Sequence, residues 1–229
     1  MSGKKVVVSI GGSILVPGNG DSDYIKRLAD MLKGICDDMH IVIVCGGGKI
    51  ARYYTETGKE LGGNTYQLDM LGIGATRLNA GLLAIALGDI SSTDIPLTVE
   101  ETASRSKAGR ITIMGGTVPG HTTDAVATMV AREMKADRVI NATSVDAVYT
   151  DDPRKNPNAK RLSKITVKEL EDLVYKEHGA GRSSVFDPLG VKIATEEKID
   201  IVIVDGRDLG DLKNAILGNG VKGTVVKSR

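Results

Sequence analysis

Runs of aliphatic and β-branched residues recur along the chain, and most of them are separated by segments with helical spacing of apolar residues. The runs lie at Val6–Ile10, Ile41–Val44, Ile111–Met114, Arg138–Ile140 and Ile199–Val204. Strands that are buried on both faces have this pattern. Because parallel neighbours need crossover helices, the alternation predicts an α/β fold, a three-layer α/β/α sandwich with a mostly parallel central sheet.

Apolar spacing and capping signals mark the intervening helices. Asp23–Met39 and Leu68–Leu87 read as amphipathic helices, and Ala125–Lys135 as a helix that follows the third strand. Thr166 and Glu169 have capping-box spacing, which predicts a helix through about Lys176. A helix begins between Asp208 and Asp211 and ends at Gly218, where glycine is favoured.

Glycine-rich turns follow three of the predicted strands. They are Gly11-Gly12-Ser13, Gly46-Gly47-Gly48-Lys49 and the long turn Gly115–Asp124. Glycine lets the backbone approach a ligand, and the start of a helix attracts anions through its free N–H groups and its dipole. Since the carboxyl ends of parallel strands share one edge, we expect one polyphosphate or two phosphorylated ligands there.

Composition narrows the class of protein. The net charge is +1, from 30 basic and 29 acidic residues, which argues against a broad surface for nucleic acid or anionic membrane. Cys36 and Cys45 lack metal or redox spacing, so we expect buried free thiols in a reducing compartment. No apolar run approaches the roughly 18 residues of a membrane span, and Met1–Lys5 carries no signal-peptide pattern, so we expect a cytosolic protein.

Two familiar nucleotide motifs do not apply. The P-loop pattern is absent because Lys49 is followed by Ile50 and Lys59 by Glu60. A G-x-G-x-x-G match at Gly218–Gly223 follows a helix and precedes the strand Thr224–Val226, the reverse of the dinucleotide-binding order, and therefore reads as a loop.

Several side chains near the glycine turns are candidates for phosphate chemistry. Lys49 and Arg52, one helical turn apart, suit a phosphate, and the hydroxyls and amides of Thr117–Thr123 suit a phosphate monoester. His121 is either a proton carrier or a hydrogen-bonding and shaping residue of that loop. Asp124 is either a carboxylate favoured by the helix dipole or a group that orients a cation.

Two further positions have both a structural and a functional interpretation. Asp69 opens an apolar helix, where it is a cap or an acceptor for ligand hydroxyls such as those of a ribose. The cluster Asn141–Pro153 is a surface turn or a base-binding region, in which Tyr149 offers a flat face and Asp152 an acceptor. The polar loop Val148–Lys164 and the earlier glycine turns suggest two lobes on one sheet, not two independent domains.

Taken together, Ile10–Ser13, Gly46–Arg52, Gly115–Asp124, Val145–Pro153 and Ser183–Leu189 resemble the amino acid kinase superfamily, and within it the archaeal-type uridylate kinases. The resemblance covers essentially the entire chain. It implies the sandwich of carbamate kinase-like folds, as one domain over residues 1–229. Residues of about 1–137 would form the acceptor lobe and about 138–229 the ATP lobe.

The resemblance also implies a role for each matching residue. Asp124 resembles the aspartate that orients catalytic basic residues. The implied ATP contacts are Gly12, Ser13, Gly48, Arg52, Thr143, Ser144, Tyr149 and Asp152. The implied UMP contacts are Gly47, Asp69, Thr117, Val118, Pro119, Gly120, His121, Thr122 and Thr123.

The chain departs from the family pattern at two positions. Ser9 stands where many members carry lysine, so another cation must meet the γ-phosphate charge, and Lys49 is the first candidate. Ala147 replaces a glycine of the nucleotide loop, a change that most turns accept. With Arg52 and Asp124, Lys49 completes the expected catalytic set.

The implied activity is transfer of the γ-phosphoryl group of MgATP to UMP in pyrimidine nucleotide biosynthesis, with Mg²⁺ held mainly by the ATP phosphates. The family also suggests a cytoplasmic homohexamer, a trimer of dimers. Isopentenyl phosphate, carbamate or an acylated amino acid is the alternative acceptor, although the turn Gly46–Lys49 lacks the histidine typical of isopentenyl phosphate kinases. A catalytically silent nucleotide-binding protein for storage or sensing is the remaining alternative.

Overall fold

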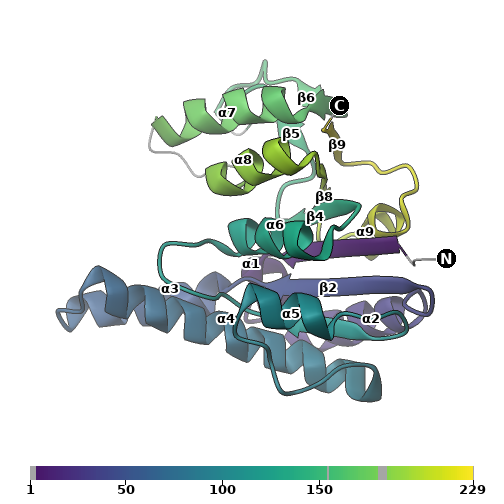
Figure 1. The fold of residues 1–229 in the computed structure, drawn as a ribbon. Coiled ribbons are helices and arrows are strands. Elements are labelled where there is room, and N and C mark those ends of the chain that lie inside the picture. The colour runs from purple at the N-terminus through teal and green to yellow at the C-terminus, as the bar shows by residue number, and fades with distance from the viewer. Residues whose placement is uncertain (1–3, 154, 180–184, 229) are drawn as a thin grey trace.

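A sheet of seven strands runs through the centre of the computed structural model, which describes residues 4–153, 155–179 and 185–228 (Figure 1). Its order is β3-β2-β1-β4-β8-β9-β7, and adjacent strands are parallel except β8 and β9. A separate pair, β5 and β6, is antiparallel. The strands are β1 (Lys4–Ile10), β2 (Met39–Cys45), β3 (Ile111–Met114), β4 (Arg138–Thr143), β5 (Val148–Tyr149), β6 (Arg161–Leu162), β7 (Lys164–Thr166), β8 (Asp200–Asp205) and β9 (Thr224–Lys227).

Helices cover both faces of the sheet, so the three-layer α/β/α sandwich is confirmed. Val6, Val8 and Ile10 pack in the core with α1, α2, α4 and α9, whereas Val7 packs in the core with α6, α7 and α8. This alternation follows from the two-residue period of a strand. The helices are α1 (Gly12–Leu15), α2 (Asp21–Lys33), α3 (Gly48–Glu60), α4 (Thr65–Leu87), the 3₁₀ turn η1 (Gly88–Ile90), α5 (Val99–Arg105), α6 (Thr123–Met134), α7 (Val167–Gly179), α8 (Pro188–Glu197) and α9 (Leu209–Leu217).

The helix expected over Asp23–Met39 has different ends. It begins at Asp21 and stops at Lys33 with Gly34 as its C-cap, while Met39 already pairs with Lys4 in the sheet. The two expected caps of the C-terminal half are confirmed. Thr166 and Glu169 exchange the reciprocal bonds of a capping box, and Gly218 ends α9 in the left-handed conformation with a φ of 83°.

The long helix α4 corrects two expectations. Asn64 caps it in a capping box with Gln67, so Asp69 lies inside the helix and is not its cap. Thr65–Ile90 is also long and apolar enough to cross a membrane by length and composition, with a mean hydropathy of 1.5, contrary to the expectation of no such run. Core helices of soluble proteins pass the same test, and one side of α4 is buried on the sheet and α2.

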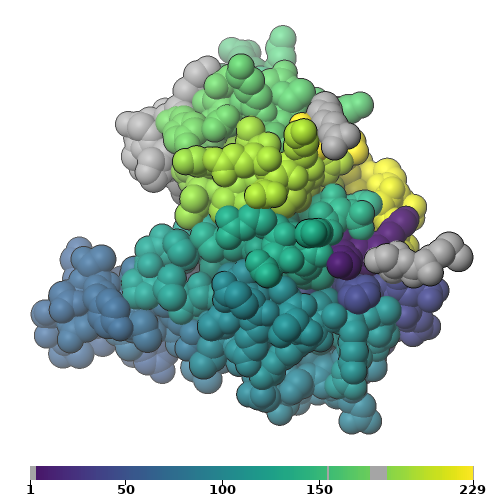
Figure 2. Space-filling model, viewed as in Figure 1, coloured from purple at the N-terminus to yellow at the C-terminus, as the bar shows by residue number. Residues whose placement is uncertain are grey.

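The remaining apolar side of α4 faces solvent. Leu78, Leu82 and Ile85 are exposed there, and α3, which contributes no buried residue, lies beside α4. The two helices extend beyond the sheet in Figure 1, and their blue segment projects from the body of the molecule in Figure 2. Cys36 and Cys45 are free and buried, as expected.

Candidate nucleotide site at the carboxyl edge of the sheet

The turns that follow β2, β1, β4 and β8 are hydrogen-bonded side by side at the carboxyl edge of the sheet. Gly46 N–H donates to Ile10 O at 2.8 Å, and Gly11 N–H donates to Ala142 O at 2.9 Å. In the same way, Gly206 N–H donates to Thr143 O at 2.8 Å. The structure therefore brings the predicted Gly12, Gly48 and Thr143 regions to one edge, where ligands of open parallel sheets bind.

The first two glycine turns touch through their backbones. A Cβ placed on Gly12 would collide with Gly48 N and Gly46 O, and one on Gly48 would collide with Gly12. Gly48 also has a φ of 59°, which side chains rarely adopt. Glycine is therefore required at these positions for the close approach of the two turns.

Polar residues of α4 hold the second and third turns in place, and the sequence analysis missed them. Asn79 donates to Gly46 O at 2.8 Å, and its side chain is buried. Thr76 Oγ1 accepts from Gly116 N–H at 2.7 Å, while Arg77 donates to Gly116 O and Thr117 O. The signal was present, because three polar residues in a largely apolar helix need partners when they face the core.

Asp69 lies beside the long turn. Its Oδ2 accepts a 2.9 Å hydrogen bond from Gly120 N–H, so the structure places Asp69 next to the loop Thr117–Thr123. Gly120 itself has a φ of 83°, which fits the tight turn after Pro119. His121 belongs to the same loop, and its buried Nδ1 atom has no hydrogen-bond partner among the described residues.

The helices α3 and α6 both have their N-terminal ends at this edge. The helix α3 begins at Gly48, and α6 begins at Thr123 with Thr122 Oγ1 accepting from Ala125 N–H as its cap. Lys49 and Arg52 lie in the first turns of α3. Both are exposed and form no ion pair within the described part of the chain, so their charges are available to a ligand.

Ser9 and Asp124 contact each other where β1 passes the start of α6. Ser9 Oγ donates to Asp124 Oδ1 at 2.7 Å. Burial raises the pKa of Asp124 to about 6; the hydrogen bond from Ser9 lowers it, and the nearby charge of Asp187 raises it. Removal of the carboxylate from water disfavours its charged form.

Asp187 is a second carboxylate that the sequence analysis did not single out. Its Oδ1 accepts from Leu189 N–H and Gly190 N–H and so caps α8, while its Oδ2 accepts from Thr122 Oγ1 at 2.8 Å. The preceding residues Ser183 and Ser184 lie outside the described part of the chain. The signal for the cap was an aspartate directly before Pro188, which is typical of a helix start.

The four residues expected around the base and ribose of ATP lie after β4. Thr143 ends that strand and Ser144 follows it, and Ser144 O accepts from Arg207 Nη2. Tyr149 lies in β5, and its hydroxyl donates to Asp146. Asp152 accepts from Lys155 N–H and Asn156 N–H through its carbonyl, which shapes the polar loop. These contacts give the local structure and leave the roles of the residues as predictions.

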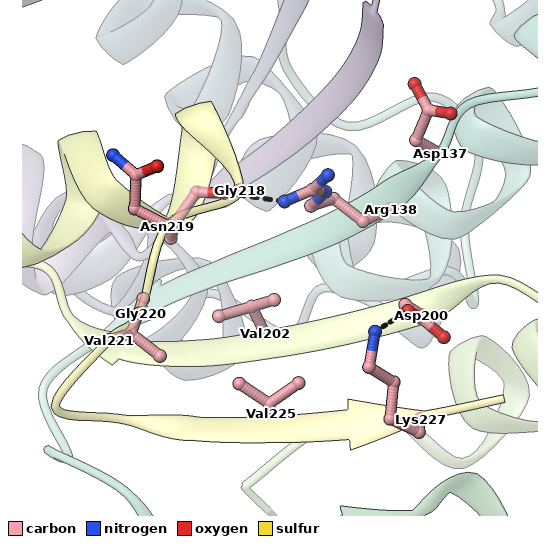
Figure 3. Close-up of a pocket in the computed structure, with 11 residues that line it drawn as sticks. Asp137, Arg138, Asp200, Val202, Gly218, Asn219, Gly220, Val221, Val225 and Lys227 are labelled. Atoms are coloured by element: carbon pink, nitrogen blue, oxygen red, sulfur yellow. Dashed lines mark hydrogen bonds and ion pairs between the residues drawn. The ribbon is translucent and has the colours of Figure 1, made fainter. Parts of the chain in front are cut away.

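A hollow of about 280 Å³ lies at the opposite, amino edge of the sheet. Its lining includes Arg138, Asp200, Val225 and Lys227 (Figure 3). The charged groups there have partners, because Arg138 donates to Ala215 O and Lys227 pairs with Asp200 at 2.7 Å. Because it lies at the amino edge, the hollow is separate from the glycine turns that follow β1, β2 and β3.

A family model described as the amino acid kinase family matches residues 4–205. The chain belongs to this family. Among its relatives, the uridylate kinase of Methanococcoides burtonii is 43% identical over 218 residues, covering 95% of this chain and 93% of that protein. The uridylate kinase of Thermococcus onnurineus is 43% identical, with coverage of 97% and 99%.

Two solved structures share the fold. The uridylate kinase of Archaeoglobus fulgidus superposes with a TM-score of 0.87 at 37% identity, covering 97% of this chain and 99% of that chain. The UMP kinase of Bacillus anthracis, at 23% identity and a TM-score of 0.80, shares the fold.

The next feature of the site is whether its side chains could bind a metal ion directly. Within the described ranges, no group of three or more His, Cys, Asp or Glu residues is arranged to hold a metal ion. The donors at the edge are mainly backbone N–H groups, hydroxyls and cations, which suit phosphate oxygens.

Proposed function

We propose that this chain transfers the γ-phosphoryl group of MgATP to UMP and forms UDP and ADP. The observation that carries the proposal is the meeting of three glycine turns at one sheet edge, in a chain that matches uridylate kinases over nearly its full length. The N-termini of α3 and α6, together with Lys49 and Arg52, which form no ion pair with any described residue, suit a pair of phosphorylated ligands.

UMP occupies the acceptor lobe in this proposal. Its contacts are Gly47, Asp69 and the loop Thr117–Thr123. Asp69 accepts a hydrogen bond from the loop and Arg77 donates one to it, while Thr76 accepts from Gly116 N–H just before it. These bonds support the assignment, because they hold the loop in a defined shape before any ligand binds. Nδ1 of His121, which has no hydrogen-bond partner among the described residues, gives the loop an additional polar atom for a ligand.

ATP occupies the C-terminal lobe and the first turns. Gly12, Ser13 and Gly48 bind phosphate oxygens through backbone N–H groups and a hydroxyl. Arg52 adds a cation, and Thr143, Ser144, Tyr149 and Asp152 bind the base and ribose. Mg²⁺ would be held mainly by the ATP phosphates and would supply charge neutralisation there.

The reaction needs charge stabilisation more than proton transfer. An oxygen of the UMP phosphate attacks the γ-phosphorus, and the bond from that phosphorus to the β,γ-bridging oxygen breaks to release ADP. The attacking phosphate is already largely deprotonated, so no general base is required. Lys49 and Arg52 stabilise the charge on the transferred group, and Asp124 orients the basic groups.

The exposed face of α4 supports the proposal of a homohexamer built from dimers. Leu78, Leu82 and Ile85 are exposed on α4, and Gly74 and Gly81 have nothing within 4 Å of an added Cβ. Such a face allows the same helix of a second copy to approach closely. We place this enzyme in the cytoplasm, at the step that supplies UDP for pyrimidine nucleotide synthesis.

A panel of acceptors tests the function. Release of ADP from MgATP is measured with UMP, CMP, isopentenyl phosphate, carbamate and an acylated amino acid. We expect UMP to give the highest kcat/KM. Preference for another acceptor would reassign the substrate, and nucleotide binding without turnover would favour a storage or sensing protein.

A further inference from the structure

We propose that Asp187 is a positioning residue that couples the UMP site to the ATP site through the hydroxyl of Thr122. This inference rests on the proposed reaction and adds a residue to which no role was assigned. It starts from one contact, the 2.8 Å hydrogen bond from Thr122 Oγ1 to Asp187 Oδ2.

The contact joins the two lobes where the loop Thr117–Thr123 meets the start of α8. Thr122 ends the loop proposed to bind UMP and caps α6 by accepting from Ala125 N–H. Asp187 caps α8 through its other oxygen, which accepts from Leu189 N–H at 2.8 Å and from Gly190 N–H at 3.2 Å. Both carboxylate oxygens are therefore engaged, one with each lobe.

Tight packing around this contact fixes the position of α8 relative to α6. A Cβ on Gly190 would lie 2.8 Å from the ring of Phe186 and 3.1 Å from Thr128 Oγ1, so α8 packs tightly on the first turns of α6. Asn141, at the carboxyl end of β4, donates to Val185 O at 3.0 Å and fixes the chain just before Asp187. Small shifts of α8 are thus passed to Thr122.

The loop Thr117–Thr123 has its other attachments on α4. Gly120 N–H donates to Asp69, and Arg77 donates to Thr117 O. Within the described ranges, the bond to Asp187 is the hydrogen bond that connects this loop to the lobe of residues 138–229. When ATP sets the position of the C-terminal lobe, Asp187 sets the end of the UMP loop.

The test measures coupling instead of activity. Calorimetry gives the Kd of UMP with and without a non-hydrolysable ATP analogue and Mg²⁺, and the ratio of the two values reports coupling. For the unaltered chain we expect a ratio of about five-fold or more. Thr122→Val, which leaves the α8 cap in place, and Asp187→Asn should each bring the ratio to within about two-fold of unity, whereas Thr122→Ser should keep it.

If the contact were purely structural, the substitutions would lower stability and leave the ratio of the two Kd values unchanged for the folded protein. An unfolding curve for each variant gives the fraction that is folded. The proposal is overturned if Thr122→Val keeps the original ratio, or if the unaltered chain binds both ligands with a ratio of one. Failure of the proposed function looks different, because the unaltered chain would then bind no UMP at all.

Discussion

Ser9 Oγ donates a 2.7 Å hydrogen bond to Asp124 Oδ1, at the point where β1 passes the first turn of α6. A neutral hydroxyl therefore stands beside the carboxylate. One hydrogen bond opposes the burial of Asp124 only in part, because the pKa of this residue still rises to about 6. The site thus contains a carboxylate whose charge is costly to the folded chain without ligands.

Asp124→Asn is expected to stabilise the ligand-free protein at pH 7.5 while lowering turnover. The pKa of Asp124 is raised from 3.8 to about 6, so the folded state favours the protonated form. The stability gained from that protonation is present below about pH 4 and is lost as the pH rises through 6. The variant should gain about 1–3 kcal/mol at pH 7.5 and little at pH 4.5.

Urea unfolding of both proteins at the two pH values measures this difference. A variant that is less stable than the original at pH 7.5 would show that the carboxylate is not strained by burial.

Ser9→Ala is expected to move the acid limb of the kcat/KM profile to higher pH. The Ser9 hydroxyl lowers the pKa of Asp124, so its removal raises that pKa further above the ordinary range. Asp187→Asn should move the limb in the opposite direction, because the charge of Asp187 raises the same pKa.

The phosphate of UMP also titrates near pH 6, with a second pKa of about 6 in phosphate monoesters. Each variant is therefore compared with the original protein on the same substrate, so that only the protein differs. Superimposable profiles for all three proteins would mean that ionised Asp124 has no part in the reaction.

Gly12→Ala is expected to destabilise the fold and to abolish ATP binding. The new Cβ would collide with the backbone of Gly48 and Gly46, and backbone cannot move as freely as a side chain. Overpacking of this kind costs about 1–3 kcal/mol or more. Gly220→Ala is the matched control, because nothing lies within 4 Å of its added Cβ.

Thermal unfolding and calorimetry with an ATP analogue give both readouts. Gly12→Ala with the stability and affinity of Gly220→Ala would contradict the close approach of the two turns.

Strands β1, β2, β3, β4 and β8 were predictable from sequence because they are buried on both faces and read as continuous apolar runs. Strand β7 was not predicted, because Ile165 is its one buried residue. The helix α3 was not predicted, although Ile50, Tyr53 and Thr57 have helical spacing, and none of its residues is buried. It begins at Gly48 and packs along α4, and no local pattern encodes those contacts. The helix α8 was missed for a different reason, since Asp187 and Pro188 carried a start signal that was not used.

The candidate site also has a part that was predictable from the sequence and a part that was not. Backbone features such as the glycine turns follow from local composition and were placed correctly at the sheet edge. The side chains that hold those turns, Thr76, Arg77 and Asn79, act from a helix far away in sequence. Tertiary hydrogen bonds of this type have no local signature beyond a polar residue in an apolar helix.

Leu78→Glu is expected to split the proposed oligomer into smaller species. Leu78 is 66% exposed on the apolar face of α4, and a buried, unpaired carboxylate would oppose association. Tyr175→Glu on α7 is the control, since Tyr175 is 50% exposed on a helix of the other face. Sedimentation velocity separates the outcomes, and an unchanged assembly in Leu78→Glu would place the interface elsewhere.

Lys49→Ala is expected to reduce kcat far more than it weakens ATP binding. Ser9 offers no positive charge, and Lys49 is an exposed cation in the first turn of α3. The charge on the phosphoryl group must be met as that group moves. Removal of one such interaction costs a factor of about 10² to 10³ in turnover. Lys59→Ala, an exposed lysine in the last turn of the same helix, should leave turnover unchanged.

Steady-state kinetics with UMP and MgATP, together with calorimetry of the ATP analogue, separate kcat from binding for both variants. A normal kcat in Lys49→Ala would transfer the role to Arg52, whose side chain is also exposed and one helical turn further along α3. A loss confined to ATP affinity would instead make Lys49 a ground-state contact, because binding substrate and transition state equally well leaves kcat unaltered.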